Sequence, residues 1–556
     1  MAATKRAFIV GGVAGGASCA ARLRRLDEQI EIVLLDRGPY VSFANCGLPY
    51  YVGDVIQEEA KLLVATPELF RKRFNIDVRT QNEVLSIDRG AREIDVRDLV
   101  SGRRYREKYD VLVLSPGAAA IRPPLPGIDL PGIFTLRTVP DSRKIREWID
   151  ARSARRAVIV GGGFIGLEMA ENLVHRGIEV TIVEMANQLM PPLDPEMAEF
   201  VHQRLKTHAE RLQLGDAVAA FEADAEGRLT VRTQKGGAFP ADMVILSIGV
   251  RPETTLAREA GLEIGVRGGI HVDDQMRTSD PNIWAVGDAV ESRSVITGVP
   301  ELIPLAGPAN RQGRIAAEVI SGRDSRFRGL QGTAVCGFFG IVVAMTGATE
   351  KALKRAGVTG FQAVYLHPGH HVGYYPGAKP IHIKLLFNLK DGRILGAQAV
   401  GEEGVERRVD VIAMAMQMGG TVFDLEGAEL CYAPQYGAAK DPVNVCGMAA
   451  ANVVRGDVEL ADWNGLPGSH ALILDVRDPH EFENGTIEGA TNIPLGQLRE
   501  RLEELPQDQE IWITCGVGQR AYYACRLLTQ RGFKARNLSG GYESYRAWYP
   551  HGVQAV

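Results

Sequence analysis

The stretch Ala157-Val158-Ile159-Val160-Gly161-Gly162-Gly163-Phe164-Ile165-Gly166 decides the fold of this chain. Apolar strand residues lead into spaced glycines, and a helical pattern follows through His175, then a second strand from 179 to 184. Glycines let the backbone approach a pyrophosphate at a helix N-terminus, where free amides and the helix dipole attract negative charge. The stretch therefore predicts a βαβ dinucleotide-binding unit, with cofactor contacts at Gly161, Gly163, Gly166 and Glu184.

The same arrangement is found at the N-terminus. Residues 6–10 predict a strand, 11–16 a tight loop, 17–26 a helix and 31–36 a second strand that ends in an acid. Two units of this kind in one chain predict two dinucleotide sites. Val13 occupies the middle glycine position of the first loop. Cofactor contacts of the first unit are expected at Gly11, Ala14, Gly15, Gly16 and Asp36.

The acids that close the second strands, Asp36 and Glu184, are expected to accept hydrogen bonds from ribose hydroxyls. Met185, Ala186 and Asn187 follow Glu184, so no arginine stands there to receive a 2′-phosphate. The second site is therefore expected to bind NADH, with NADPH as the alternative.

Length and composition limit the choices of class. A chain of 556 residues predicts several domains, and a formal net charge of -5 argues against nucleic-acid and anionic-membrane partners. Seven scattered cysteines without zinc spacing predict reduced thiols, no metal site and a cytoplasmic location. The apolar run 7–21 mimics a signal peptide, but its glycines suit a phosphate loop. The run 334–348 is short and interrupted by glycine, so no membrane span is expected.

Further segments are typical of a flavoprotein. Matched strand-to-glycine turns, 110–117 and 242–249, follow the two nucleotide units. Another strand ends at Asp288, which is placed to bind a ribityl hydroxyl of FAD. The helix that opens at 304–306 and runs to about 320 is placed to stabilise negative charge on the reduced flavin. The expected contacts are Ser115, Pro116, Gly117, Gly249, Gly287, Asp288, Pro304, Leu305 and Ala306.

The run Ser42-Phe43-Ala44-Asn45-Cys46-Gly47-Leu48-Pro49-Tyr50-Tyr51 contains the thiol that is expected to carry the chemistry. No second cysteine lies near Cys46 in the sequence. Its oxidised form therefore needs a partner from outside the chain, which is oxygen, sulfur or a small thiol.

Residues 1 to about 450 resemble the two-dinucleotide flavoprotein disulfide reductases, and Ser42 to Cys46 resembles the motif of their single-cysteine branch. That branch contains NADH oxidases and peroxidases, and coenzyme A-disulfide or persulfide reductases. The oxidases and peroxidases typically have a histidine where this chain has Ala14. The resemblance implies an α/β fold with two Rossmann-like domains, for FAD (1–115 and 255–325) and NAD(P)H (150–254), and an α+β dimerisation domain (326–450).

Two tyrosine motifs, 373–377 and 431–436, resemble those of the coenzyme A reductases, where the partner subunit of a homodimer contributes a tyrosine pair to the active site. Tyr374 and Tyr432 match that pair. The resemblance also places Ser18, Arg22, Arg25, Ser42, Phe43 and Asn45 along a coenzyme A channel. Further candidates are Asn310, Arg311 and the cluster Arg71, Lys72 and Arg73, for which a solvated helix face is the alternative.

The pattern changes near residue 450, and 451–468 is predicted to be a linker. The segments 475–477, 482–490, 515–520 and 538–542 resemble the rhodanese family, which implies a C-terminal α/β rhodanese domain at 469–556. The resemblance implies a loop whose inward-facing amides and helix dipole hold a persulfide anion on Cys515, with Arg520 adding positive charge. The remaining cysteines, Cys19, Cys336, Cys431, Cys446 and Cys525, are expected in the core.

These features predict an FAD enzyme that uses NAD(P)H to reduce coenzyme A persulfide, polysulfide or disulfide through Cys46. Coenzyme A is either a substrate or a bound cofactor, and the other partners are small sulfur compounds. Catalytic roles are expected for Cys46, Cys515, Tyr374, Tyr432 and Arg520. The alternatives are an NADH oxidase or peroxidase with a sulfenic acid at Cys46, and a sulfur-carrier or redox-sensing module.

Overall fold

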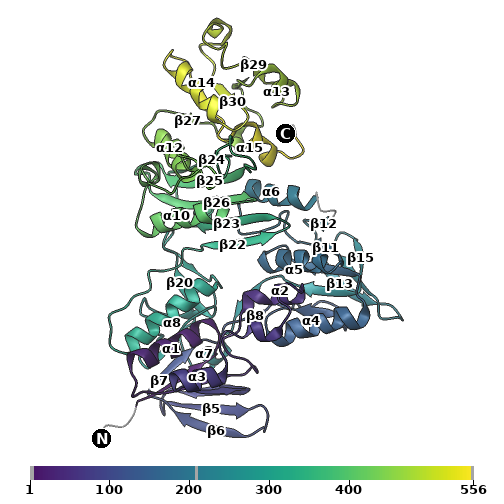
Figure 1. The fold of residues 1–556 in the computed structure, drawn as a ribbon, viewed down its shortest axis with the longest axis vertical. Coiled ribbons are helices and arrows are strands. Elements are labelled where there is room, and N and C mark those ends of the chain that lie inside the picture. Colours follow the sequence, from purple (N-terminus) through teal and green to yellow (C-terminus); the bar gives the residue numbers. More distant parts are fainter. Residues whose placement is uncertain (1–4, 207–210, 553–556) are drawn as a thin grey trace. The chain divides into compact units, whose positions relative to one another are not determined.

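The computed structural model describes residues 5–206 and 211–552 (Figure 1). It divides into two compact units. The first contains residues 1–187 and 210–332, and the second contains residues 188–209 and 333–556. None of the helices in the described part is long and apolar enough to cross a bilayer.

The first nucleotide unit is built on a parallel sheet between helices. Its strands, in sheet order, are β19 (Ile283–Ala285), β7 (Val111–Leu114), β1 (Arg6–Val10), β2 (Glu31–Asp36) and β3 (Asp77–Thr80). Helix α1 (Ala14–Leu26) connects β1 to β2, and α8 (Ala306–Ile320) packs against α1. A Cβ atom on Gly313 would lie 2.2 Å from the carbonyl oxygen of Gly15, so a glycine is needed where these helices meet.

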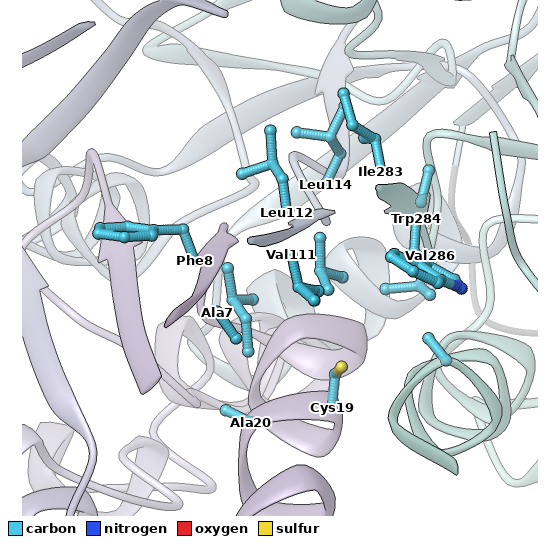
Figure 2. Packing of buried hydrophobic residues seen from close by; sticks show 14 of the residues in the cluster. Ala7, Phe8, Cys19, Ala20, Val111, Leu112, Leu114, Ile283, Trp284 and Val286 are labelled. Atoms are coloured by element: carbon cyan, nitrogen blue, oxygen red, sulfur yellow. The ribbon is translucent and has the colours of Figure 1, made fainter. Parts of the chain in front are cut away.

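The core of this unit lies between the sheet and its helices (Figure 2). Phe8 of β1, Leu112 of β7 and Ile283 of β19 are fully buried, and Cys19 of α1 lies in the same cluster. Strands covered on both faces are continuously apolar, as their sequences are here. Burying each large apolar side chain contributes about 1.5–3 kcal/mol to the free energy of folding. The sheet therefore holds the loops at its edge in fixed positions.

The second nucleotide unit repeats the plan. The parallel strands, in sheet order, are β12 (Arg211–Gln213), β11 (Glu179–Val183), β10 (Arg156–Val160), β16 (Met243–Leu246) and β9 (Ile133–Thr135). Helix α5 (Phe164–His175) follows β10, and α4 (Val139–Arg152) follows β9. Both βαβ units predicted from the sequence are confirmed, and β1 and β2 have the predicted bounds.

Smaller elements complete the first unit. Two antiparallel sheets consist of β4 (Asn82–Asp88), β5 (Glu93–Asp98) and β6 (Arg104–Lys108), and of β13 (Val218–Ala223), β14 (Leu229–Thr233) and β15 (Ala238–Ala241). The short helices are α2 (Leu48–Val52), α3 (Pro67–Phe74) and α7 (Thr255–Glu259).

The second unit begins with an antiparallel sheet of five strands. In sheet order they are β22 (Ala334–Phe338), β23 (Ile341–Gly347), β26 (Ile394–Gly401), β25 (Ile381–Asn388) and β24 (Phe361–Leu366). Its helices are α6 (Pro195–Lys206), α9 (Glu350–Arg355), α10 (Val405–Gln417), α11 (Val422–Glu426) and α12 (Pro442–Val454). Helix α6 belongs to this unit although its residues fall inside the stretch predicted to bind NAD(P)H.

A buried ion cluster ties α6 to the antiparallel sheet. Lys384 is fully buried, and its Nζ lies 2.9 Å from Asp194, 2.5 Å from Glu196 and 2.8 Å from Glu350. These acids form the single group of the described residues that stands close enough to hold a metal ion. The Lys384 ammonium already lies between the three carboxylates, so its positive charge takes the place of a metal ion.

The C-terminal sheet is parallel. Its strands, in sheet order, are β27 (Glu459–Leu460), β31 (Ala535–Asn537), β30 (Ile511–Thr514), β28 (Leu472–Asp475) and β29 (Thr491–Asn492), with helices α13 (Pro479–Glu483), α14 (Gln519–Thr529) and α15 (Gly541–Trp548). Strand β27 lies within the stretch predicted to be a linker. Tyr365 of β24 shares a buried cluster with Trp463 and Trp512, so this domain and the antiparallel sheet share a core.

Candidate active sites

Two glycines of the first loop lie so close to neighbouring backbone that no side chain fits at their positions. Gly11 has φ +97°, and a Cβ atom there would lie 2.0 Å from the carbonyl oxygen of Ser115. A Cβ on Gly16 would lie 1.9 Å from the carbonyl oxygen of Gly11. Ser115 Oγ accepts a hydrogen bond from the Gly16 amide at 3.0 Å. The loop conformation therefore depends on the glycines that the sequence pattern identified.

The acids at the ends of β2 and β11 hold these loops in place. Asp36 Oδ2 accepts a hydrogen bond from the Gly12 amide at 2.8 Å, and Glu184 Oε2 accepts one from the Gly162 amide at 2.7 Å. Burial raises the pKa of Asp36, although its hydrogen bonds oppose the shift. The sequence predicted ribose contacts for both acids but did not reveal their role in fixing the loops.

A cavity of about 920 Å³ opens beside the first loop. It has the size of a large cofactor pocket. Its lining includes most of the predicted flavin contacts, namely Gly11, Ala14, Gly15, Asp36, Ser115, Pro116, Gly117, Gly287, Asp288, Pro304 and Ala306. Gly16, Gly249 and Leu305 are not among the lining residues. The Gly16 amide instead donates to Ser115 Oγ. The glycines, the acid and the volume of the cavity fit FAD.

Asp288 does not stand alone in this cavity. Its Oδ2 accepts a hydrogen bond from Arg137 Nη2 at 2.6 Å, and Arg137 Nε donates to the carbonyl oxygen of Ala118 at 3.0 Å. Arg137 also lines the cavity, but no sequence pattern singled it out. The pair sets the carboxylate of Asp288 in one orientation.

Cys46 lies in a short 3₁₀ turn, Asn45–Gly47, and is exposed toward the same cavity. Neighbouring atoms remove part of the water around its sulfur, and this burial raises its pKa. The negative charges of Glu168 and Asp288 act in the same direction, while Arg137 lowers the pKa. Helix α2 has only one turn and a half and does not reverse this shift.

Glu168 of α5 is a site residue that the sequence did not reveal. Burial raises its pKa to about 7, and the Tyr50 hydroxyl donates to its Oε1 over 3.5 Å. Helix α2 packs against α5, where a Cβ on Gly53 would lie 2.1 Å from Asn172 Oδ1. This packing brings the Cys46 segment to the second nucleotide unit. A carboxyl group with a perturbed pKa near a reactive thiol is a functional candidate. The one feature of the sequence that could have indicated Glu168 is its position just after the glycine fingerprint.

The predicted coenzyme A residues divide into two groups. Ser18, Ser42, Phe43, Asn45 and Asn310 line the cavity next to Cys46. Arg22 is not a lining residue; it is half-buried and pairs with Glu318 at 2.5 Å. Arg25, Arg311 and residues 71–73 are not among the lining residues, and the last three form an exposed face of α3.

Asn45 carries a buried acceptor without a donor. Its Oδ1 atom has no hydrogen-bond partner in the described structure. The great majority of buried polar atoms in proteins have a hydrogen-bond partner, and leaving one without a partner costs about 1–3 kcal/mol. Because Asn45 precedes Cys46 and lines the cavity, this atom favours a ligand that donates a hydrogen bond.

In the second unit, the hydroxyls of Tyr374 and Tyr432 lie 2.8 Å apart. Both are exposed, Tyr374 by 74% and Tyr432 by 47%. Its hydrogen bond with the Tyr432 hydroxyl raises the pKa of Tyr374. The preceding residue, Cys431, is exposed, so the expectation that it lies in the core is wrong.

Cys515 directly follows β30 and begins the loop before α14. It is 1% exposed, and its Sγ accepts a hydrogen bond from the Gly518 amide at 3.2 Å. The Tyr542 amide donates to the carbonyl oxygen of Cys515 at 2.7 Å from the start of α15. The predicted inward-facing loop is therefore present. Arg520 is not a free cation, however, since it forms a bidentate pair with Glu481.

Comparison with known families agrees with this geometry. Residues 5–313 match the family model of pyridine nucleotide-disulphide oxidoreductases, and residues 333–441 match the dimerisation domain of that family. The chain belongs to the pyridine nucleotide-disulphide oxidoreductases. Residues 459–547 match the rhodanese-like domain. The resemblance to both families is confirmed, and with it the predicted α/β fold.

Individual relatives narrow the comparison. The chain is 33% identical over 450 residues to the coenzyme A disulfide reductase of Staphylococcus haemolyticus, covering 81% of this oxidoreductase and 100% of the relative. The structure of reduced Bacillus anthracis CoADR-RHD is 49% identical with a TM-score of 0.96, covering 98% of each chain. The structure of a NAD-dependent persulfide reductase from A. fulgidus is 36% identical with a TM-score of 0.90, and the match covers 97% of this chain and 100% of that chain.

Proposed function

We propose that this oxidoreductase uses NADH to reduce coenzyme A disulfide or coenzyme A persulfide at Cys46. The observation that carries the proposal is the position of Cys46, a free thiol exposed in the cavity that the first glycine loop and Asp288 line. The unpaired Oδ1 of Asn45 adds an acceptor beside it. The named activities of the similar reductases supply the substrate class.

The cavity residues would hold FAD, with its pyrophosphate at the glycine loop and Asp288 facing its ribityl chain. When bound, FAD supplies the means to accept a hydride from NADH and to deliver two electrons to a disulfide. The second nucleotide unit, with its loop at 161–166, would hold NADH. Polar and charged side chains at Ser18, Arg22 and Asn310 would orient coenzyme A toward Cys46.

The Cys46 thiolate attacks one sulfur of coenzyme A disulfide. An S–S bond forms between Cys46 and one coenzyme A, and the other leaves as a thiolate with the electron pair of the broken bond. With coenzyme A persulfide, attack on the inner sulfur gives the same mixed disulfide and expels HS⁻. Two electrons from NADH then reduce the mixed disulfide, which restores the Cys46 thiolate and releases coenzyme A.

The leaving thiolate or HS⁻ needs a proton. Only one hydroxyl of the Tyr374–Tyr432 pair can donate to the other, so the second phenol proton remains available. Both residues lie within 333–441, the stretch that matches a dimerisation domain. In the proposed homodimer, this pair comes from the partner subunit and protonates the leaving group.

The rhodanese domain would carry sulfane sulfur on Cys515. Its loop directs the Gly518 amide at the sulfur, which favours an anionic persulfide there. Joining this domain to the reductase raises the effective concentration of the rhodanese product at Cys46.

Mass spectrometry of the protein as purified tests the proposal. A coenzyme A adduct is expected on the Cys46 peptide and not on exposed Cys431, and anaerobic NADH should remove it. Coenzyme A disulfide should then support NADH oxidation without oxygen. An unmodified Cys46 together with NADH oxidation that needs only oxygen would instead identify an oxidase.

A further inference from the structure

Two opposite charges meet beside the Cys515 loop. Arg520 Nη1 lies 2.6 Å from Glu481 Oε2, and Arg520 Nη2 lies 2.7 Å from Glu481 Oε1. Such a fork-to-fork geometry makes a strong and well-oriented pair. The Arg520 guanidinium lowers the pKa of Glu481 to about 2, so this carboxylate is charged at any physiological pH.

The pair stands at the loop rather than on a distant surface. A Cβ atom on Gly516 would lie 3.5 Å from Arg520 Nη2 and 3.9 Å from Glu481 Oε1. Asp478 Oδ2 lies 3.8 Å from Arg520 Nη1 and adds a second negative charge. Residues 516–519 are Gly, Val, Gly and Gln, so Arg520 is the loop's single cation. Arg477 of the neighbouring segment is paired with Asp475. The charged side chains beside the loop therefore carry no net positive charge, and the amide of Gly518 remains the group that faces the sulfur.

Sulfur donors differ in the charge that they bring to this place. When a thiolate attacks the outer sulfur of thiosulfate, the S–S bond breaks and its electron pair leaves with sulfite, a dianion. When it attacks the outer sulfur of a thiol persulfide, RSSH, the product is Cys–S–SH and the leaving group is RS⁻, with a single charge. A donor that releases a dianion needs positive charge at the loop, and a thiol persulfide does not.

We propose that Glu481, by neutralising Arg520, makes the Cys515 site selective for thiol persulfides over dianionic sulfur donors. The inference rests on the proposed sulfur-carrying role of Cys515. Glu481 does not contact the reacting sulfur, so it acts as a specificity residue through Arg520. The substrate class that follows, a thiol-bound persulfide, is the class that the reductase unit would also use.

The test uses the full-length holoenzyme and measures sulfur transfer to cyanide from thiosulfate and from glutathione persulfide. Wild-type protein should have the higher kcat/KM with the persulfide. Glu481→Gln should raise kcat/KM for thiosulfate about tenfold and change that for the persulfide less than twofold. Glu483→Gln makes the same charge change at the exposed end of α13 and should change neither value.

A double variant, Glu481→Gln with Arg520→Gln, removes both charges and should restore the donor ratio of the wild type. A donor ratio in Glu481→Gln within twofold of the wild type would overturn the inference, as would equal use of both donors by the wild type. Cys515→Ser separates the two proposals. If this variant still transfers sulfur from either donor, the role of Cys515 itself is wrong.

Discussion

The hydroxyls of Tyr374 and Tyr432 lie 2.8 Å apart, although 58 residues separate them in the chain. They come from two loops of the dimerisation domain and present one shared proton-donating group. Two exposed phenols held together in this way have little structural purpose in a single subunit. The arrangement is what a protonating pair needs if it serves the thiol site of a partner subunit.

Tyr432→Phe should therefore slow the release of coenzyme A. We expect kcat with coenzyme A disulfide to fall about tenfold, since a general acid typically contributes at least this much and a thiolate needs little help to leave. Flavin content and the rate of flavin reduction by NADH should stay unchanged. Tyr436 is another exposed tyrosine of the same segment, so Tyr436→Phe is the control. Equal kcat values for both variants and the wild type would argue against the pair.

Glu168→Gln should make Cys46 more reactive. The Glu168 carboxylate raises the pKa of Cys46, and its own pKa of about 7 means that it is charged at pH 8 and largely neutral at pH 6. Iodoacetamide should modify Cys46 about threefold faster at pH 8 in the variant, because the thiolate is the reactive form. The difference should disappear at pH 6.

The control for this experiment is Glu147→Gln, an exposed residue of α4. It removes the same charge from the same unit and should leave the alkylation rate unchanged. A slower reaction of Glu168→Gln at pH 8 would show that Glu168 does not oppose the thiolate.

Asn45→Leu tests whether a ligand pairs with the buried amide oxygen. If coenzyme A donates to Oδ1, the change should raise KM for coenzyme A disulfide about tenfold, while KM for NADH stays constant. If nothing pairs with this atom, removing it should stabilise the fold and leave both KM values alone. Steady-state kinetics and thermal denaturation distinguish the two outcomes.

Gly541→Ala should impair the rhodanese loop alone. A Cβ atom at this position would lie 2.2 Å from the carbonyl oxygen of Cys515, and Gly541 has φ +61°. We expect sulfur transfer to fall more than tenfold while coenzyme A disulfide reduction continues. Gly468→Ala imposes a similar strain at φ +77° with no atom nearby, so it should retain sulfur transfer. Equal sulfur transfer in both variants would show that the close packing behind the loop is dispensable.

Local patterns predicted much of this fold. The strands and loops at residues 6–36 and 156–184 follow from apolar runs and glycines that lie next to each other in the sequence. Cys46 and Cys515 could be identified in the same way, because each stands in a short motif with its own chemistry. The glycine loops need their residues for reasons of local geometry, and local geometry is what a sequence records.

Contacts between distant residues could not be predicted. Arg137 is 151 residues from Asp288, and Glu481 is 39 residues from Arg520, so no spacing rule connects them. The pKa of Glu168 depends on its burial beside α2, which becomes visible only when the two elements are packed. The sequence does not predict strand β27, because two residues carry too little pattern to indicate a strand.

Anaerobic NADH oxidation by Cys46→Ser, with coenzyme A disulfide as the substrate, tests the central claim most directly. The account predicts that turnover falls to the background rate while the variant keeps its FAD and NADH still reduces that flavin. Cys431→Ser, which removes the other exposed thiol, should remain active. Turnover by Cys46→Ser at the wild-type rate would contradict the account, since no thiol would then be needed to receive coenzyme A.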